Sequence, residues 1–211
     1  SAIPGEQGLV DAVLEFLKKD RIHLEKQNLL ITTSGQHGLD LTGRTFLNKG
    51  DIVLVDRPTF AGALVAFKME NPQFIGVDIE PDGTNTVVLK ETIKQLQLND
   101  KTPKFIYVVP DFQNPTGITM SLEKRKELLK ISYEYHIPIV EDSPYRDLRY
   151  YGDAIPSLFS LDQELYEGGA NVIGLYTFSK IFCPGMRVGF NIGPSDVITK
   201  MTNIKEGNIL K

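Results

Sequence analysis

The sequence contains a single cysteine, Cys183, and no apolar run that approaches the ~18 residues of a membrane span. One cysteine cannot form a disulfide within the chain, and free thiols are typical of a reducing compartment. No signal peptide opens the chain. We therefore predict a cytoplasmic protein that does not enter a membrane.

An excess of charge of one sign is also missing. The chain carries 23 Lys and Arg residues against 27 Asp and Glu residues, a net charge of −4, and the two signs are interspersed. This pattern argues against a basic surface for nucleic acid or for lipid headgroups. With 41% hydrophobic and 24% charged residues, the 211-residue chain suits one globular domain, or at most two, with small molecules or another protein as partners.

What the sequence does have is a regular alternation of short apolar runs and segments with helical periodicity. The predicted strands cover residues 29–32, 51–55, 74–79, 104–109, 137–140, 172–176 and 188–192. The predicted helices cover residues 9–17, 36–47, 61–69, 89–96, 122–131 and 195–204. This alternation predicts an α/β fold: a mostly parallel seven-stranded sheet with helices on both faces.

Two stretches depart from the alternation. The connection between 172–176 and 188–192 is too short for a helical crossover, so these two strands are predicted to be antiparallel neighbours. Residues 146–169 have poor periodicity and contain Gly152, Pro156 and a Gly-Gly pair. We predict an irregular segment there, with one short helical turn near residues 160–165.

Residues suited to a binding site follow almost every predicted strand. They are Gly35, Gln36, Phe60, Asn114, Asp142, Tyr145, Thr177, Ser179, Lys180 and Arg187. In parallel sheets, ligands bind at the carboxyl ends of the strands. The sequence therefore predicts that these side chains form one site.

Most of these residues also have an ordinary structural explanation. Gly35 and Gln36 begin a helix whose free N–H groups suit an anion, but a plain N-cap by Ser34 explains the pattern equally well. Phe60 could cover a planar ligand or pack in the core. Asp142 leaves a hydrophobic strand, so we expect a cationic partner for it or for its neighbour Glu141.

Lys180 follows a predicted strand and is flanked by Thr177 and Ser179, with Arg187 seven residues further on. Hydroxyl groups and arginine bind phosphate oxygens, and a desolvated lysine among cations loses its proton and becomes a nucleophile. The alternative is a solvated lysine on a loop. Only the combination with the other strand-end residues favours the chemical interpretation.

Three motifs together resemble one family. Asn114-Pro115-Thr116-Gly117, Asp142-Ser143-Pro144-Tyr145 and Ser179-Lys180 with Arg187 look like the fold-type-I pyridoxal-phosphate aminotransferases of class I and II. Within that family the chain is similar to the 2-aminoadipate, kynurenine and aromatic aminotransferase branch, to which Pro156-Ser157-Leu158-Phe159 also corresponds. The resemblance implies pyridoxal 5′-phosphate as cofactor, a homodimer and no metal.

The resemblance also implies a role for each site residue. Lys180 forms the Schiff base with the cofactor and moves the α-proton, and Asp142 pairs with the pyridine nitrogen. Asn114 and Tyr145 bond the phenolic oxygen of the ring, and Phe60 stacks on the ring. The implied phosphate-binding residues are Gly35, Gln36, Thr177, Ser179 and Arg187. Lys180, Asp142 and Tyr145 are the implied catalytic residues.

Some features depart from the family pattern. His37 stands where glutamine is usual, Phe60 replaces the commoner tyrosine, and Ser143 replaces a frequent acid. Family members also carry an N-terminal segment and a C-terminal domain, which supplies the arginine that binds the substrate carboxylate. We therefore expect residues 1–211 to be the cofactor-binding large domain, which as a fragment would be a dimer or a marginal monomer without turnover.

The resemblance leaves three functions open. The first is an aminotransferase that exchanges an amino group between an α-amino acid and a 2-oxo acid. The second is the cofactor-binding domain of a winged-helix transcription regulator, and the third is a carbon–sulfur lyase or racemase. All three use Lys180, so the sequence motifs alone do not separate them.

Overall fold

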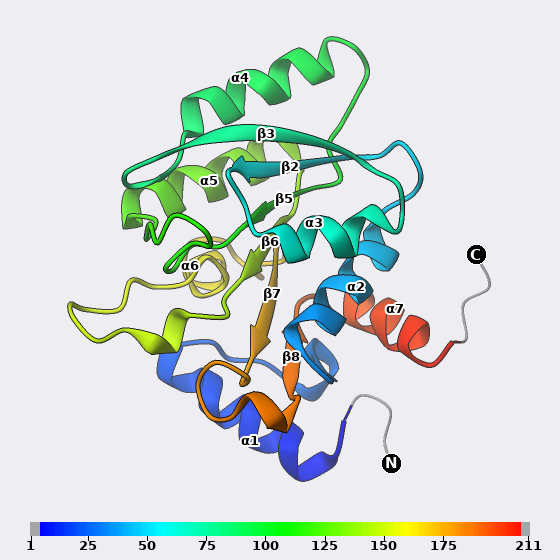
Figure 1. The fold of residues 1–211 in the computed structure, drawn as a ribbon, viewed down its shortest axis with the longest axis vertical. Coiled ribbons are helices and arrows are strands. Elements are labelled where there is room, and N and C mark those ends of the chain that lie inside the picture. The colour runs from blue at the N-terminus through cyan, green and yellow to red at the C-terminus, as the bar shows by residue number, and fades with distance from the viewer. Residues whose placement is uncertain (1–4, 208–211) are drawn as a thin grey trace.

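A computed structural model describes residues 5–207 of the chain. Its strands are β1 (Leu29–Thr32), β2 (Ile52–Arg57), β3 (Gln73–Glu80), β4 (Gly83–Thr84), β5 (Phe105–Val108), β6 (Ile139–Asp142), β7 (Val172–Thr177) and β8 (Gly189–Ile192). They form one sheet in the order β1-β8-β7-β6-β5-β2-β3-β4 (Figure 1). The α/β fold class is confirmed.

The strand directions follow the prediction, with one addition. β2, β3, β5, β6 and β7 are parallel, and β8 lies antiparallel between β1 and β7, as the short connection predicted. The prediction of seven strands was incomplete because β4 forms an eighth, antiparallel to β3. β4 has only two residues and begins at Gly83 with φ 127°, so it is too short to show an alternating pattern.

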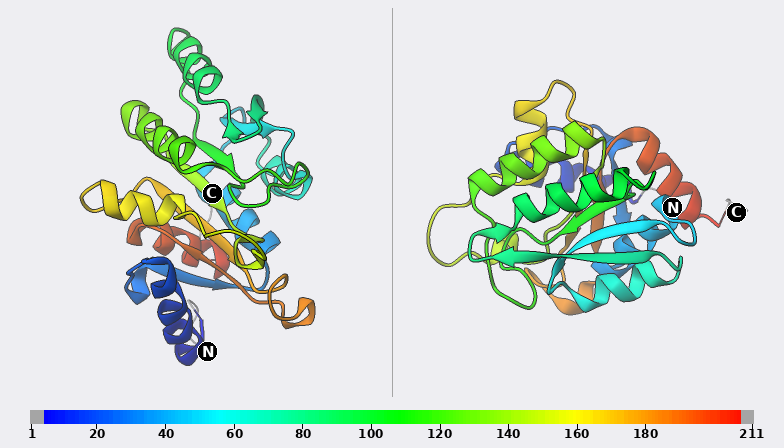
Figure 2. Two further views of the ribbon diagram at one scale, coloured as in Figure 1. Left: turned by 90° about the vertical axis from the view of Figure 1, so that its left-hand side faces the viewer. Right: turned by 90° about the horizontal axis from the view of Figure 1, so that it is seen from above.

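Seven α-helices are present in the described residues: α1 (Gln7–Leu17), α2 (Gly35–Phe46), α3 (Ala61–Lys68), α4 (Thr86–Gln97), α5 (Leu122–Tyr135), α6 (Leu158–Leu165) and α7 (Ser195–Lys205). Short 3-10 helices are η1 (Lys18–Asp20), η2 (Lys26–Asn28), η3 (Arg146–Leu148) and η4 (Pro184–Met186). Helices α1, α4, α5 and α6 pack on one face of the sheet, and α2, α3 and α7 pack on the other (Figure 2).

Each parallel strand is apolar on both sides because helices cover both faces of the sheet. In β2, Ile52 and Leu54 join the core under α1, α4, α5 and α6, whereas Val53 and Val55 join the core under α2, α3 and α7. The strands therefore read as continuous apolar runs, which is why the sequence located them well.

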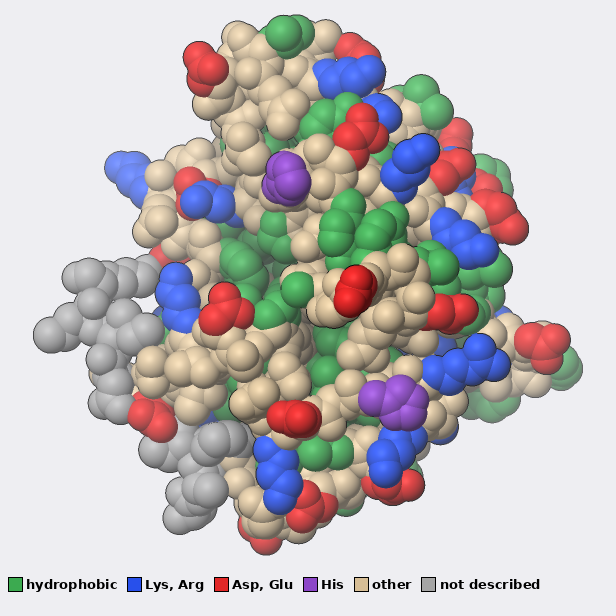
Figure 3. Space-filling model, turned by 180° about the vertical axis from the view of Figure 1, so that it is seen from behind, with side chains coloured by type: hydrophobic (Ala, Val, Ile, Leu, Met, Phe, Trp, Pro, Cys, Tyr) green, Lys and Arg blue, Asp and Glu red, His purple; other side chains and the backbone are tan. Residues whose placement is uncertain are grey.

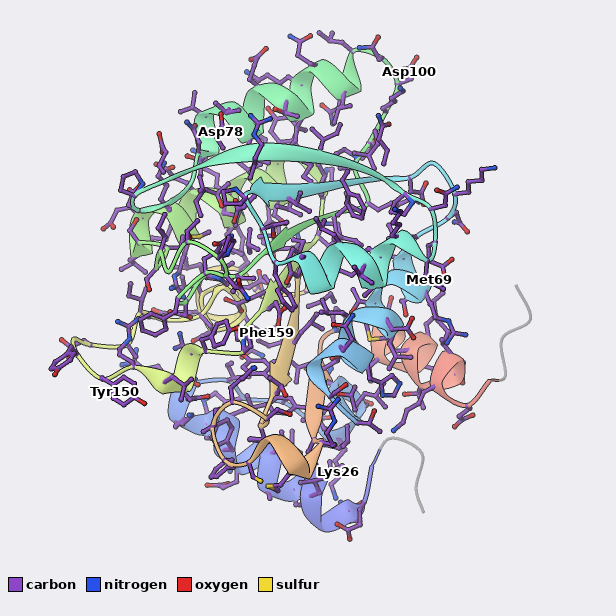
Figure 4. The ribbon with its side chains drawn as sticks, in the orientation of Figure 1. Lys26, Met69, Asp78, Asp100, Tyr150 and Phe159 are labelled. Carbon is purple, nitrogen blue, oxygen red and sulfur yellow. The ribbon has the colours of Figure 1, made fainter. Side chains whose placement is uncertain are left out.

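The segment 146–169 was predicted to be irregular with one helical turn, but it contains the eight-residue helix α6. Ser157 caps this helix by accepting a hydrogen bond from the amide of Ser160 at 3.1 Å. Five residues of α6 in succession are buried, from Leu158 to Asp162, so the helix lacks the polar face that periodicity detects. The loop before it projects outward, with Tyr150 at 85% exposure (Figure 4).

The described surface shows no segregation of charge on the face seen in Figure 3, where acidic and basic side chains are interspersed. None of the described helices is both long enough and apolar enough to cross a membrane. The sequence predicts that the last helix, 195–204, is followed by a Gly207-Asn208 stop; Gly207 has φ 72°, and Asn208 lies outside the described residues.

Candidate active site

A cavity of about 380 Å³ lies at the carboxyl ends of the strands. Its lining residues are Ser34, Gly35, Gln36, Leu39, Phe60, Val109, Asn114, Asp142, Pro144, Tyr145, Thr177, Ser179, Lys180 and Arg187. All ten residues that the sequence nominated are among them. The cavity includes the point where the strand order changes direction. From β2 the chain continues to β3 on one side of β2, and it then crosses to β5 on the other side.

One end of the cavity is built from the first turn of α2 and the end of β7. Ser34 accepts a hydrogen bond from the amide of His37 at 3.1 Å, so the predicted N-cap is present. The amides of Gly35 and Gln36 precede it in the first turn, where a helix offers them no acceptor and its dipole favours anions. The N-cap and the anion site are therefore compatible at this terminus.

Two hydroxyl groups face the same end. A Cβ added at Gly35 would meet Cβ of Thr177 at 3.4 Å, so Gly35 allows the helix terminus to lie close to β7. Oγ of Ser179 is buried and has no hydrogen-bond partner among the described residues. Buried hydroxyl groups normally have partners, so this orphaned donor fits an anionic ligand held at the helix terminus.

Asp142 lies at the end of β6 and is 6% exposed. Burial raises the pKa of its carboxyl to about 6, and a hydrogen bond of 2.7 Å donated by the hydroxyl of Tyr107 acts in the opposite direction. The expected cation is found for Glu141 but without direct contact: neither carboxylate forms an ion pair among the described residues, yet burial raises the pKa of Glu141 and the guanidinium groups of Arg125 and Arg146 lower it to a smaller extent. Glu141 instead accepts the amides of Leu158 and Phe159, at 2.7 and 3.0 Å.

Asn114 and Tyr145 meet from different strand ends. Nδ2 of Asn114 lies 3.4 Å from the hydroxyl of Tyr145. Asn114 belongs to the loop after β5, and Tyr145 lies directly before η3. Both groups can donate to a third acceptor placed between them and the cavity.

Phe60 is half-buried and packs partly against the core, so the core-packing alternative holds in part, and the ring also lines the cavity. A Cβ added at Gly62 would lie only 2.4 Å from Cζ of Phe60. Gly62 therefore leaves the space in which the ring lies at the cavity wall. The sequence did not indicate this function, because nothing in the pattern relates a helical glycine to a ring two residues earlier.

Lys180 lines the cavity but is exposed, as is Arg187. The sequence predicted a desolvated lysine, and the structure does not show one. Lys180 lies on the loop between β7 and β8, where Phe182, Cys183, Gly185, Met186 and Arg187 are exposed as well. Lys180 therefore reaches the cavity from its solvent side.

Other residues of the site were missed. Ser34, Leu39, Val109 and Pro144 line the cavity without having been nominated. Val109 and Pro144 adjoin nominated motifs, so proximity in sequence could have found them. Tyr107 could not be found this way, because its hydroxyl reaches Asp142 only through the pairing of β5 with β6.

The fold and the cavity bring a helix N-terminus, an aromatic ring, a buried carboxylate and a lysine together at the carboxyl edge of a mostly parallel sheet. The chain belongs to the family described as aminotransferase class I and II, whose model matches residues 2–210. The resemblance inferred from the motifs is confirmed.

Three relatives illustrate the match. The chain is 39% identical to aromatic-amino-acid aminotransferase 1 of Thermococcus litoralis, over 88% of this chain and 43% of that protein. It is 39% identical to 2-aminoadipate transaminase of Thermus thermophilus, over 93% and 48%. The crystal structure of Pyrococcus horikoshii kynurenine aminotransferase, in complex with PMP, superimposes with a TM-score of 0.91 at 40% identity, over 98% of this chain and 50% of that one. The chain thus spans about half the length of these relatives.

Proposed function

We propose that this chain holds pyridoxal 5′-phosphate and serves an aminotransferase that exchanges an amino group between an α-amino acid and a 2-oxo acid. The observation that carries the proposal is that an anion-binding helix terminus, a buried carboxylate and a lysine line one cavity. Relatives that act on aromatic amino acids and on 2-aminoadipate support an α-amino acid as the substrate class.

In this proposal the amides of Gly35 and Gln36 and the hydroxyls of Thr177 and Ser179 hold the phosphate, together with Arg187. Phe60 covers one face of the ring. The cradle fits the phosphate because Oγ of Ser179 is buried and otherwise without a partner.

The other three polar residues act on the ring and on the reacting carbon. Bound pyridoxal phosphate supplies an electron-withdrawing ring that stabilises negative charge at the α-carbon of the substrate. With the cofactor bound, the carboxylate of Asp142 would pair with the ring nitrogen and favour its protonated form, while Asn114 and Tyr145 would donate to the phenolic oxygen. Nζ of Lys180 would hold the cofactor when substrate is absent, and during amino transfer it would accept the α-proton of the amino acid and deliver it to the cofactor.

We further propose that residues 1–211 form the large, cofactor-binding domain of a cytoplasmic protein and that the complete protein is a homodimer. The length of the relatives supports the domain assignment, since each is about twice as long as this chain. A winged-helix regulator or a carbon–sulfur lyase would use the same cofactor residues. An amino-transfer assay with an amino acid and 2-oxoglutarate, on the protein of full family length, separates these alternatives.

Borohydride reduction of the chain with pyridoxal phosphate, followed by peptide mapping, tests the central claim. We expect a single reduced adduct on Lys180 and none in Lys180→Ala. Lys200→Ala is the matched control, because Nζ of Lys200 bonds the carbonyl of Thr45 away from the cavity. An adduct on a different lysine would overturn the assignment.

A further inference from the structure

A buried group of charged residues lies beneath Asn114 and Tyr145 and has no part in the function proposed above. It consists of Asp20, Asp111, Arg125, Arg146 and Arg149, and we call it the Asp111 cluster. Asp111 is 1% exposed and Arg125 is fully buried. Oδ1 of Asp111 lies 2.9 Å from Nη2 of Arg125 and 3.4 Å from Nη2 of Arg149. Oδ2 of Asp111 lies 3.1 Å from Nη1 of Arg146.

Arg125 closes the loop that carries Asn114. Its Nε donates to the carbonyl of Met120 at 3.0 Å, and its Nη2 donates to the carbonyl of Pro110 at 3.4 Å. These carbonyls lie at the two ends of the loop, whose backbone is also joined by the Met120 amide and the Pro110 carbonyl at 2.7 Å. One guanidinium therefore fixes both ends of the loop and the carboxylate of Asp111 within it.

Arg146 does the same for the segment that carries Tyr145, to which it is bonded in sequence. Its Nη1 contacts Asp111 and donates to the carbonyl of Ile155 at 2.7 Å, and its Nη2 contacts Asp20 at 3.2 Å. The Asp111 to Arg146 ion pair is therefore a buried polar link between the Asn114 loop and the Tyr145 segment, and it is shorter than the 3.4 Å contacts of Arg149 with Asp111 and of Asn114 with Tyr145.

The electrostatics keep this link charged. Burial alone raises the pKa of the Asp111 carboxyl, but the adjacent guanidinium groups of Arg125 and Arg146 outweigh it and lower the pKa. Buried ion pairs contribute little net stability compared with apolar packing of equal volume, and they are better explained where they specify one arrangement. Here the specified arrangement is the position of one loop relative to the other.

We propose that Asp111 and Arg146 are positioning residues, whose ion pair sets the spacing of Asn114 Nδ2 and the Tyr145 hydroxyl so that both donate to one acceptor oxygen. The inference rests on the proposed function, in which that acceptor is the phenolic oxygen of pyridoxal phosphate. The two donors lie 3.4 Å apart. Hydrogen bonds weaken steeply outside about 2.7–3.2 Å, so a shift of either loop by about 1 Å removes one of them.

The test compares two probes that differ only at the phenolic oxygen: pyridoxal 5′-phosphate and its 3-O-methyl ether. We expect the unmodified chain to prefer the free phenol, because the methyl ether cannot present a charged acceptor to both donors. In Arg146→Gln the preference is expected to fall about tenfold, which is the contribution of one hydrogen bond to a charged group. Asn114→Ala removes one donor directly and should show a fall of similar size.

Asp20→Asn is the matched control. It removes the charge of the second carboxylate paired with the same guanidinium and leaves the contact with Asp111 in place. If Arg146 acts only on stability, Asp20→Asn and Arg146→Gln should both lower the unfolding midpoint, and neither should change the preference for the free phenol over the methyl ether. The positioning role predicts that only Arg146→Gln lowers the preference, and that Arg146→Lys, which keeps the charge, restores part of it.

The outcomes distinguish the positioning role of Arg146 from the proposed function. If the unmodified chain binds pyridoxal phosphate on Lys180 and prefers the phenol, but Arg146→Gln keeps that preference, the positioning inference alone is overturned. If the unmodified chain binds neither probe, the proposed function falls and this inference falls with it. If circular dichroism shows that Arg146→Gln is unfolded, Arg146→Lys replaces it in the test. The preference for the free phenol is then expected to fall about threefold, and an unchanged preference would contradict the positioning role.

Discussion

The two sides of the cavity are held in different ways. The ring side, residues 110–117 and 142–146, is fixed by buried partners from other elements, including Arg125 and Tyr107. The lysine loop, residues 177–187, is fixed by bonds that stay within or next to itself, such as the amides of Ile181 and Phe182 to the carbonyl of Phe178. Lys180 and Arg187 on this loop are exposed.

This difference separates a fixed frame from an accessible nucleophile. Groups that must meet a ligand at fixed distances benefit from a buried, preorganised frame. A nucleophile that must reach a carbon and then release it benefits from a position with fewer fixed partners, because local stability is lowest where contacts are local. The comparison predicts that changes on the ring side alter stability as well as the chemistry of the site, whereas changes on the lysine loop leave stability nearly unchanged and alter access to the nucleophile.

The largest effect is expected from Asp142→Ala. Removing the carboxylate leaves the phosphate cradle and Lys180 in place, so pyridoxal phosphate should still bind. Proton removal from the amino acid should slow by several orders of magnitude, because negative charge at the α-carbon is no longer stabilised through a protonated ring.

Single-turnover conversion of bound pyridoxal phosphate by an amino acid, in a protein of full family length, measures this effect. Asp142→Asn is the companion variant, since it keeps the hydrogen bond with Tyr107 without the charge. An unchanged rate in Asp142→Ala would contradict the role of the carboxylate.

The sequence predicted the site far better than the frame that supports it. The ten nominated residues meet in one cavity because each follows a strand, and strand ends are visible as the limits of apolar runs. Asp111 lies inside the Asn114 loop, but its partners Arg125 and Arg146 are 14 and 35 positions away. Such pairings depend on how α5 and η3 pack, which periodicity does not encode.

The fold shows the same division. Strands buried on both faces were located well, and the antiparallel pair followed from connection length alone. Helix α6 was predicted only as one short turn near residues 160–165, because its first five residues are all buried, and strand β4 was missed because it has two residues. A local sequence pattern identifies elements whose burial is regular along their length, such as strands that are buried on both faces. It fails where tertiary packing decides which residues form a helix or strand.

The next effect concerns stability and compares two arginines. Arg125→Met is expected to lower the free energy of unfolding by about 3–5 kcal/mol, because it leaves the buried carboxylate of Asp111 with fewer partners. Arg187→Met, on the exposed lysine loop, is expected to change it by less than about 0.5 kcal/mol. Urea unfolding of both variants tests the comparison, and equal losses would show that the two sides are not held differently.

The pH dependence of stability should also differ between the sides. Burial raises the pKa of Asp142 from 3.8 to about 6, so between these values the folded chain binds a proton that the unfolded chain has lost. The contribution of Asp142 to stability therefore falls as pH rises through this window, by at most about 3 kcal/mol, and this loss is complete above pH 6 or so.

Asp142→Asn should remove this fall, so that its stability gains on the unmodified chain as the pH rises from about 4 to about 7. Lys180→Gln should follow the unmodified chain throughout. Urea unfolding at a series of pH values measures all three proteins. Parallel curves for the unmodified chain and Asp142→Asn would mean that the carboxyl is not desolvated in the folded state.

The smallest effect uses thiol labelling to compare the two sides directly. Cys183 is exposed on the lysine loop and is the single cysteine of the sequence. It should react with a thiol reagent in the folded chain within about tenfold of its rate in the unfolded chain.

A matched probe for the ring side is Ser143→Cys in a Cys183→Ser background, because Ser143 is 2% exposed and its hydroxyl has no partner among the described residues. Reaction there requires local opening of the frame, so it should be slower than at Cys183 by about 100-fold or more.

Pyridoxal phosphate should slow labelling of Cys183, since the phosphate and aldehyde draw Arg187 and Lys180 into the cavity. It should leave the already slow reaction at position 143 nearly unchanged. Equal labelling rates at the two positions would mean that the ring side opens as readily as the lysine loop, and the distinction between a fixed frame and an accessible nucleophile would not hold.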